Sequence, residues 1–205
     1  MIVVAEIPAQ LETYLDWLVE TLDGTTDLTA AYLIGSAARG AYVHGRSDVD
    51  VIAVTAHPLT LDEKRAIVAA AEALPSPARK LELVVYAAGS HRWELNLNTG
   101  EHASFDPSEE PPFWFVLDRA IAEQDVVVLA GPPWHELFEP VERDAVLAAL
   151  EEAIDWQERE QPLEAGSILN ALRAWAWLET GRWVSKPYAA AWLRQRVRAA
   201  IQEAR

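Results

Sequence analysis

The sequence has no cysteine and very little lysine, and each of these shortages excludes some classes of function. Without cysteine there is neither a disulfide framework nor thiolate chemistry, a composition that suits a cytosolic protein. Lysine occurs only at Lys64, Lys80 and Lys186, and 17 basic residues stand against 32 acidic ones, a net charge of −15. Such a field repels nucleic acids and anionic membranes and attracts cations. We therefore expect no nucleic-acid or membrane partner.

Long hydrophobic runs are also missing. No stretch reaches the length of a membrane span, and the first 15 residues lack the basic flank and apolar run of a signal peptide. No internal repeat, low-complexity segment or heptad pattern is present. A chain of 205 residues allows one large domain or two small ones, and nothing in the pattern forces a dimer, so we expect a monomer.

The hydrophobic pattern divides the chain into an α/β half and a helical half. Strands are predicted over residues 28–34, 48–55, 81–86 and 125–129. Helices are predicted over 8–22, 60–74 and 113–123, with a short helix or turn over 37–42 and a polar connector over 87–112. Three further helices, rich in Ala, Leu and Trp, are predicted over 143–158, 165–180 and 187–204. The expected domains are 1–140 and 141–205.

The most informative stretch is residues 31–55, where two aspartates open the second strand. Side chains alternate along a strand, so Asp48 and Asp50 share one face while Val49 and Val51 point into the core. Two neighbouring carboxylates repel each other unless a cation lies between them. Hard oxygen ligands of this kind suit a Mg²⁺ ion that also holds substrate phosphates.

Three more residues extend this pattern. Gly35 allows the backbone to approach a phosphate closely, and Ser36 supplies a hydroxyl to bind it. Glu82 lies in the middle of an apolar strand, where a carboxylate needs a partner. The set indicates two-metal nucleotidyl transfer, with Glu82 as a further metal ligand or as the base for an acceptor hydroxyl. The alternative, a strand end with solvated aspartates, leaves Glu82 unexplained.

Other candidate residues carry weaker signals. Lys186 opens the last predicted helix, and a cation at a helix N-terminus favours phosphate, although a solvated lysine is the alternative. Trp175, Trp177 and Trp183 could stack on a base or a drug ring, but core packing is favoured for the first two. The histidines lack metal-ligand spacing, and we expect them at the surface or in loops: His44, His57, His91, His102 and His135.

The segment LIGSAARGAYVHGRSDVDVIAV resembles the Gly-Ser…Asp-x-Asp signature of the polymerase-beta-like nucleotidyltransferase superfamily. Three later segments resemble a narrower group, the aminoglycoside adenylyltransferases that modify spectinomycin and streptomycin: KLELVVY, VVVLAGPPWHELFEPV and LRAWAWLETGRWVSKPYAAAWL. The resemblance runs from about residue 28 to about residue 198. It implies an α+β fold, with a mixed sheet flanked by helices in an N-terminal nucleotidyltransferase domain and an α-helical C-terminal domain that completes the ATP and substrate cleft.

The resemblance also implies a reaction, the transfer of AMP from ATP to a drug hydroxyl with release of pyrophosphate. By matching positions, the metal ligands would be Asp48 and Asp50, the catalytic base Glu82, and the ATP-binding residues Gly35, Ser36, Ser47 and Lys186. The candidate drug-binding residues are Glu82 and the acidic Glu164. The implied cofactor is Mg²⁺, and the implied partner is a cationic aminocyclitol or aminoglycoside, whose charge suits an acidic protein.

Departures from the family pattern refine this expectation. Members that use streptomycin have a tryptophan and an aspartate where the helical domain begins, whereas residues 157–167 here contain Glu160 and Glu164 but no tryptophan. We therefore expect spectinomycin rather than streptomycin as the acceptor. Family members often continue with further helix beyond the position of Arg205, so we also expect weaker nucleotide affinity.

Two other functions fit the same motif. A minimal nucleotidyltransferase of the toxin–antitoxin type would transfer AMP to a partner protein, but such enzymes are usually shorter and lack a helical domain like residues 141–205. A degenerate member would bind a nucleotide or a cationic small molecule without turnover, and the intact Asp48, Asp50 and Glu82 argue against it. A different small-molecule acceptor is a third alternative, because the motif does not select one.

Overall fold

The computed structural model describes residues 7–161 and 164–204, which form two compact units. The first unit comprises the chain up to residue 112 together with residues 121–140, and the second comprises residues 113–120 and 141 onward. The sequence places all of residues 113–140 in the first half, whereas the structure packs residues 113–120 with the second unit. None of the helices in the described part of the chain is long and apolar enough to span a membrane.

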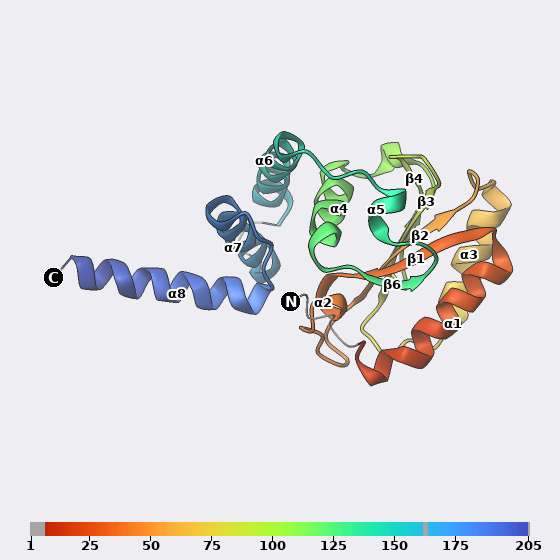
Figure 1. The fold of residues 1–205 in the computed structure, drawn as a ribbon, viewed down its shortest axis with the longest axis horizontal. Helices are drawn as coiled ribbons and strands as arrows, with labels where there is room; N and C mark the ends of the chain where they lie inside the picture. Colours follow the sequence, from red (N-terminus) through yellow and green to blue (C-terminus); the bar gives the residue numbers. More distant parts are fainter. Residues whose placement is uncertain (1–6, 162–163, 205) are drawn as a thin grey trace. The chain divides into compact units, whose positions relative to one another are not determined.

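The first unit is built on a mixed sheet of six strands in the order β5-β4-β3-β2-β1-β6 (Figure 1). The strands are β1 (Leu28–Ile34), β2 (Val49–Thr55), β3 (Leu81–Ala87), β4 (Trp93–Asn98), β5 (His102–Ser104) and β6 (Val127–Ala130). Strands β2 and β3 are parallel, and the other neighbouring pairs are antiparallel. The α+β fold with a mixed sheet, predicted from the sequence, is confirmed.

Helices α1 (Ala9–Thr25) and α3 (Leu61–Ala73) cover one face of this sheet (Figure 1). An apolar stripe on α1 is buried there against alternate strand residues, and the centre of this core consists of Leu11, Leu15, Leu18, Leu33, Val49, Val51, Leu83 and Leu95. Helix α3 begins with a capping box, in which Thr60 and Glu63 satisfy each other's backbone N–H groups. The connection from β2 through α3 to β3 allows these two strands to run parallel.

The opposite face of the sheet is closed at one end by aromatic side chains. Trp134, in the short helix α5 (Trp134–Leu137), stacks on Phe138 with ring centroids 4.1 Å apart. Tyr32 of β1 meets the edge of Trp134, and Tyr86 of β3 meets the edge of Phe138. The Tyr32 hydroxyl donates to the carbonyl of Pro132 at 2.8 Å, so its polar tip is satisfied although the ring is buried.

The second unit contains α6 (Arg143–Glu160), α7 (Ala165–Thr180) and α8 (Lys186–Glu203), together with the first residues of α4 (Phe113–Asp125). Trp156 of α6 contacts the rings of Phe113 and Trp114, which is why the start of α4 packs with this unit. Trp177 and Trp183 are buried and stacked at 5.3 Å between centroids, as core packing requires for Trp177.

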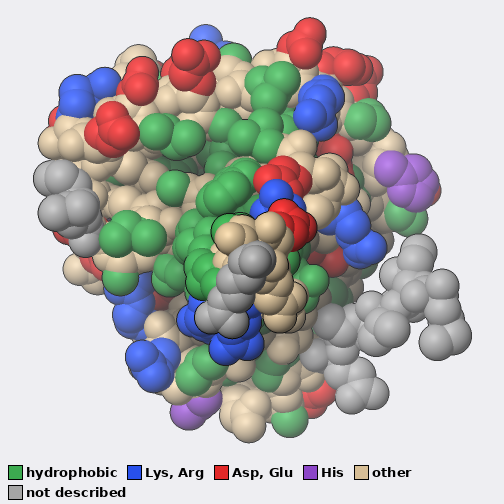
Figure 2. All heavy atoms as spheres, turned by 90° about the vertical axis from the view of Figure 1, so that its left-hand side faces the viewer, with side chains coloured by type: hydrophobic (Ala, Val, Ile, Leu, Met, Phe, Trp, Pro, Cys, Tyr) green, Lys and Arg blue, Asp and Glu red, His purple; other side chains and the backbone are tan. Residues whose placement is uncertain are grey.

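One tryptophan differs from its prediction. Trp175 is 42% exposed on α7, where its indole N–H donates to Glu179 and its ring meets the edge of Trp192 on α8, so the expected core position is wrong. It belongs to a set of exposed apolar side chains on α7 and α8 that also includes Ile168, Leu178, Tyr188, Val197 and Ile201. Hydrophobic and basic side chains lie side by side on the face shown in Figure 2.

The predicted polar connector over residues 87–112 is also wrong, because it contains β4, β5 and a short 3₁₀ helix (Pro107–Glu109). Strand β4 alternates buried Trp93, Leu95 and Leu97 with polar residues, which is the pattern of a strand with one face in the core. Helix α1 continues through Gly24 to Thr25, beyond the predicted end, and the Thr25 hydroxyl donates back to the carbonyl of Thr21 at 2.6 Å.

Substitution of two glycines tests the backbone conformation that the structure gives them. Gly131, after β6, has φ +83°, and an added Cβ would overlap the carbonyl oxygen of Thr29, whereas Gly24 is helical with open space around it. We expect Gly131→Ala to lower the free energy of unfolding by more than about 1 kcal/mol and Gly24→Ala to raise it by about 0.5–1 kcal/mol. Urea denaturation of both variants measures this, and equal effects would contradict the assigned conformations.

Candidate functional site

A row of polar side chains crosses the three central strands on the sheet face opposite α1 and α3. Asp50 of β2 pairs in parallel register with Glu82 of β3, and Glu82 pairs in turn with Asn98 of β4. Their strand neighbours Val49, Val51, Leu81, Leu83 and Leu97 are at most 1% exposed in the core. Alternation along each strand therefore turns Asp50, Glu82 and Asn98 to the same face, as the sequence predicts for Asp50 and Glu82 separately.

Gly35 lies directly against the carboxylate of Asp50. The antiparallel pairing of β1 with β2 ends at Ile34 and Asp50, and Gly35 then turns the chain into the short helix α2 (Gly35–Ala38) with φ +67°. A Cβ at Gly35 would overlap the Asp50 carboxylate. The glycine is therefore needed both for its backbone conformation and for the position of Asp50.

The two serines of the motif lie at the ends of the loop that joins α2 to β2. Ser36 is in the first turn of α2, and its carbonyl accepts from the backbone N–H of Ala41 at 2.9 Å. The Ser47 hydroxyl accepts from the backbone N–H of Val43 at 3.0 Å, and the Ser47 carbonyl accepts from the N–H of Arg79 at 3.1 Å. Because the Ser47 hydroxyl acts as an acceptor in the loop, its own proton can be donated to a ligand oxygen.

Asp48, one residue before β2, is bound by an arginine that no sequence motif singles out. Arg79 donates from Nε to Oδ1 at 2.8 Å and from Nη2 to Oδ2 at 2.6 Å, a bidentate ion pair. The hydrogen bonds and the charge of Asp48 raise the pKa of the Arg79 guanidinium. The pairing is long-range, and its only trace in the sequence is that Arg79 precedes one strand as Asp48 precedes the other.

Lys80 supplies the partner that the carboxylate of Glu82 requires in this apolar strand. Its Nζ lies 2.8 Å from Glu82 Oε1, 2.7 Å from Glu101 Oε2 and 3.0 Å from Asn98 Oδ1, so three acceptors surround three N–H donors. Burial lowers the pKa of Lys80, but its hydrogen bonds to Glu101 and Glu82 outweigh burial and the pKa is raised. Lys80 therefore stays charged and holds the Glu82 carboxylate in place.

The chemistry of these donors fits magnesium, because aspartate oxygens combined with substrate phosphates are its usual ligands. Within residues 7–161 and 164–204, however, no three His, Cys, Asp or Glu side chains are disposed to hold a metal ion. The ion pairs explain this arrangement, because the carboxylate of Asp48 is directed to Arg79 and that of Glu82 to Lys80. Asp48 and Asp50 are the residues that would hold the ion.

Lys186 and Glu164 belong to the second unit. Lys186 is exposed and opens α8, where the hydroxyl of Ser185 caps the helix by accepting from the N–H of Tyr188 at 3.3 Å. Glu164 is exposed at the N-cap position of α7, and its side chain makes no capping hydrogen bond. Their binding roles stay predictions.

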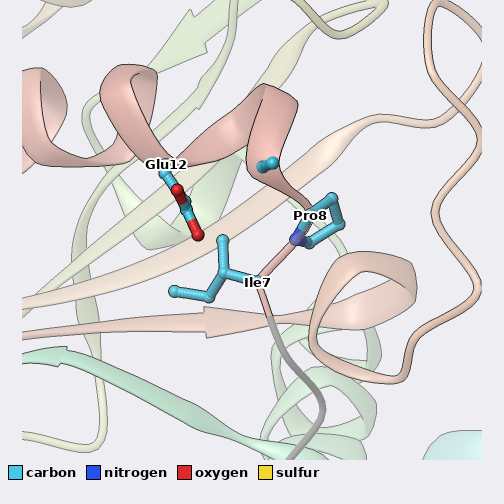
Figure 3. Close-up of a pocket in the computed structure, with 4 residues that line it drawn as sticks. Ile7, Pro8 and Glu12 are labelled. Carbon is cyan, nitrogen blue, oxygen red and sulfur yellow. The ribbon is translucent and has the colours of Figure 1, made fainter.

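The histidines are exposed, as predicted, and two of them lie close to a carboxylate; one of these, His102 on β5, pairs with Asn98 at the end of the polar row. His57 lies 3.2 Å from Asp27, and His102 lies 3.0 Å from Glu110. A recess at the start of α1 is lined by Ile7, Pro8, Ala9 and Glu12 (Figure 3). None of the site residues named above lines this recess.

Comparison with known proteins finds similarity to aminoglycoside adenylyltransferases. A family model described as "Aminoglycoside adenylyltransferase, C-terminal domain" matches residues 136–205. Proteins from Shigella flexneri and Escherichia coli, each named "Aminoglycoside (3'') (9) adenylyltransferase", are 26% identical to this chain over 224 residues. The alignments cover 98% of this chain and 83% and 82% of those proteins.

A solved structure has the same fold. The spectinomycin adenyltransferase AAD(9) from Enterococcus faecialis, crystallised with ATP and spectinomycin, matches with a TM-score of 0.68 at 19% identity. The match covers 95% of this chain and 88% of that one. Together with the sequence matches, this shows that the chain is similar to aminoglycoside adenylyltransferases over nearly its whole length and shares the fold of one of them.

Proposed function

We propose that this protein transfers AMP from ATP to a hydroxyl of an aminoglycoside-type antibiotic, with spectinomycin favoured over streptomycin. The observation that carries the proposal is the pairing of Asp50 with Glu82 on adjacent parallel strands, with Gly35 against Asp50 and Lys80 holding Glu82. A nucleotidyl transfer site needs a metal-binding carboxylate and a base on one surface, and this row supplies both.

In this mechanism Glu82 removes the proton from the acceptor hydroxyl. The hydroxyl oxygen then forms a bond to the α-phosphorus of ATP, and the bond from that phosphorus to the bridging oxygen breaks to release pyrophosphate. Ser36 and Ser47 donate hydroxyl protons to phosphate oxygens, and Lys186 is proposed as a further ATP-binding residue. Asp48 and Asp50 would hold Mg²⁺, which supplies charge neutralisation of the triphosphate when bound.

The choice of acceptor rests on charge and on one missing residue. The net charge of −15 attracts a cationic aminocyclitol, and Glu82 and Glu164 are the carboxylates assigned to it. The segment 157–167 has no tryptophan to stack on streptomycin, although residues 162–163 within it lie outside the described residues. Addition of a bulky anion to the drug would prevent it from fitting its ribosomal site, so the biological role proposed is resistance, exercised by a cytosolic monomer.

The direct test is pyrophosphate release with ATP and Mg²⁺, measured with spectinomycin, with streptomycin and without a drug. We expect release with spectinomycin alone. Release with streptomycin as well would contradict the specificity assigned to residues 157–167. ATP binding without release in either reaction would move the function to another acceptor.

Substitution of Glu82 tests the assigned base. Glu82→Gln keeps the size of the side chain but cannot accept the proton, so we expect drug-dependent pyrophosphate release to fall by about 100-fold or more. Binding of ATP should change little. Glu20→Gln, an exposed change on α1 at the other face of the sheet, is the matched control. Unchanged turnover in Glu82→Gln would show that another group is the base.

Substitution of Asp50 tests the metal site. Asp50→Asn removes the charge while keeping the contact with Gly35, so we expect Mg²⁺-dependent ATP affinity to fall by about tenfold or more, because a charged ligand is replaced by a neutral one. Isothermal titration calorimetry measures this loss, with exposed Asp16→Asn on α1 as the control. Equal Mg²⁺-dependent affinity in wild type and Asp50→Asn would rule out Asp50 as a ligand.

A further inference from the structure

Arg79 has no part in the function proposed so far, although it is bound directly to a proposed metal ligand. We propose that Arg79 is a nucleotide-binding residue, whose guanidinium pairs with Asp48 and moves to the triphosphate when metal and nucleotide bind. This inference rests on the proposed function, and it adds a residue and an exchange of partners to the same site.

The backbone holds Arg79 next to the loop that carries the motif serine. The N–H of Arg79 donates to the carbonyl of Ser47 at 3.1 Å, and the N–H of Val49 donates to the carbonyl of Lys80 at 3.0 Å. These bonds continue the parallel pairing of β2 and β3 beyond the strand ends. Wherever its side chain points, the base of Arg79 therefore stays beside Ser47 and Asp48.

The side chains of the two adjacent cations differ in their freedom to move. Lys80 is 10% exposed and is held by acceptors on three segments, so it cannot leave Glu82 without breaking several hydrogen bonds. Arg79 is 54% exposed, and its hydrogen-bonded partner, Asp48, is 21% exposed. Because the Arg79 side chain is open to solvent, water can solvate its guanidinium when it leaves Asp48, and a ligand can reach it.

Charge explains why an exchange is required. Both oxygens of Asp48 accept hydrogen bonds from the guanidinium, and a divalent cation at the same carboxylate would lie next to this positive charge. Arg79 therefore opposes metal binding as long as it stays paired with Asp48. An incoming triphosphate offers the guanidinium a better partner, because its planar set of N–H donors matches phosphate oxygens.

The alternative is that Arg79 serves only as a counter-ion that keeps the loop before β2 in place. The two possibilities predict different signs. An exchanging Arg79 weakens the binding of metal alone and strengthens the binding of nucleotide, whereas a counter-ion with a purely structural role affects the binding of nucleotide only through loss of stability.

The test is calorimetric titration of the whole protein with Mg²⁺ alone and then with ATP in the presence of Mg²⁺. We expect Arg79→Gln to bind Mg²⁺ alone several-fold more tightly and ATP about tenfold more weakly than wild type, because a charge-assisted bidentate contact is lost. Arg79→Lys keeps the charge but lacks the planar set of N–H donors, so its ATP affinity should lie between those of Arg79→Gln and wild type. Arg65→Gln on α3, an exposed arginine with an ion pair to Asp62, controls for net charge.

Other results of these titrations would contradict the inference. If Arg79→Gln binds Mg²⁺ more tightly but ATP as wild type does, Arg79 is only a counter-ion of Asp48 and the inference is wrong. If Arg79→Gln binds ATP more weakly but Mg²⁺ as wild type does, Arg79 does not exchange between Asp48 and the nucleotide. Equal shifts in Arg65→Gln would assign the effect to net charge and overturn the inference. If Arg79→Gln unfolds, Arg79→Lys replaces it, and ATP affinity equal to wild type in that variant overturns the bidentate contact. Wild-type protein that binds no ATP would overturn the proposed function itself, and the Mg²⁺ titrations would still report separately on competition at Asp48.

Discussion

The site depends on the parallel pairing of β2 with β3, because this register places Asp50 beside Glu82. The same pairing continues through the preceding residues and places Arg79 and Lys80 next to Ser47 and Asp48. A slip of one residue would turn Glu82 into the core and Leu81 to the polar face. The burial of Leu81, Leu83 and their neighbours against α1 and α3 therefore determines the geometry of the carboxylates on the other face.

Two of the three proposed catalytic carboxylates are neutralised by cations that directly precede β3. These cations differ in burial: Lys80 is enclosed and positions Glu82, whereas Arg79 pairs with Asp48 but is open to solvent. Repulsion between neighbouring carboxylates is thus relieved without a metal ion. The arrangement keeps an acidic site folded while its outer cation can still be exchanged.

The sequence predicts the face on which the candidate carboxylates lie better than it predicts the number of strands in the sheet. Alternation around Asp48, Asp50 and Glu82 identifies the polar face because the flanking residues are strongly apolar, and the structure buries those residues as expected. Strand β4 was missed because half of it is polar, and α5 because its four residues are too few for a periodic pattern. The Arg79–Asp48 pair could not be predicted at all, since it joins residues 31 positions apart through a register that only the folded sheet defines.

The scarcity of lysine has a structural counterpart in the first unit. Lys64 is largely buried, pairs with Glu94 at 3.1 Å and donates to the carbonyl of Phe105, which ties α3 to β4 and to the segment after β5. Lys80 joins β3 to β4 and to Glu101. Both lysines are therefore largely buried and paired with carboxylates, and they add little positive charge to the surface. The two lysines therefore weaken the negative surface field that favours a cationic substrate very little. The cation that holds Glu82 is part of the sheet itself.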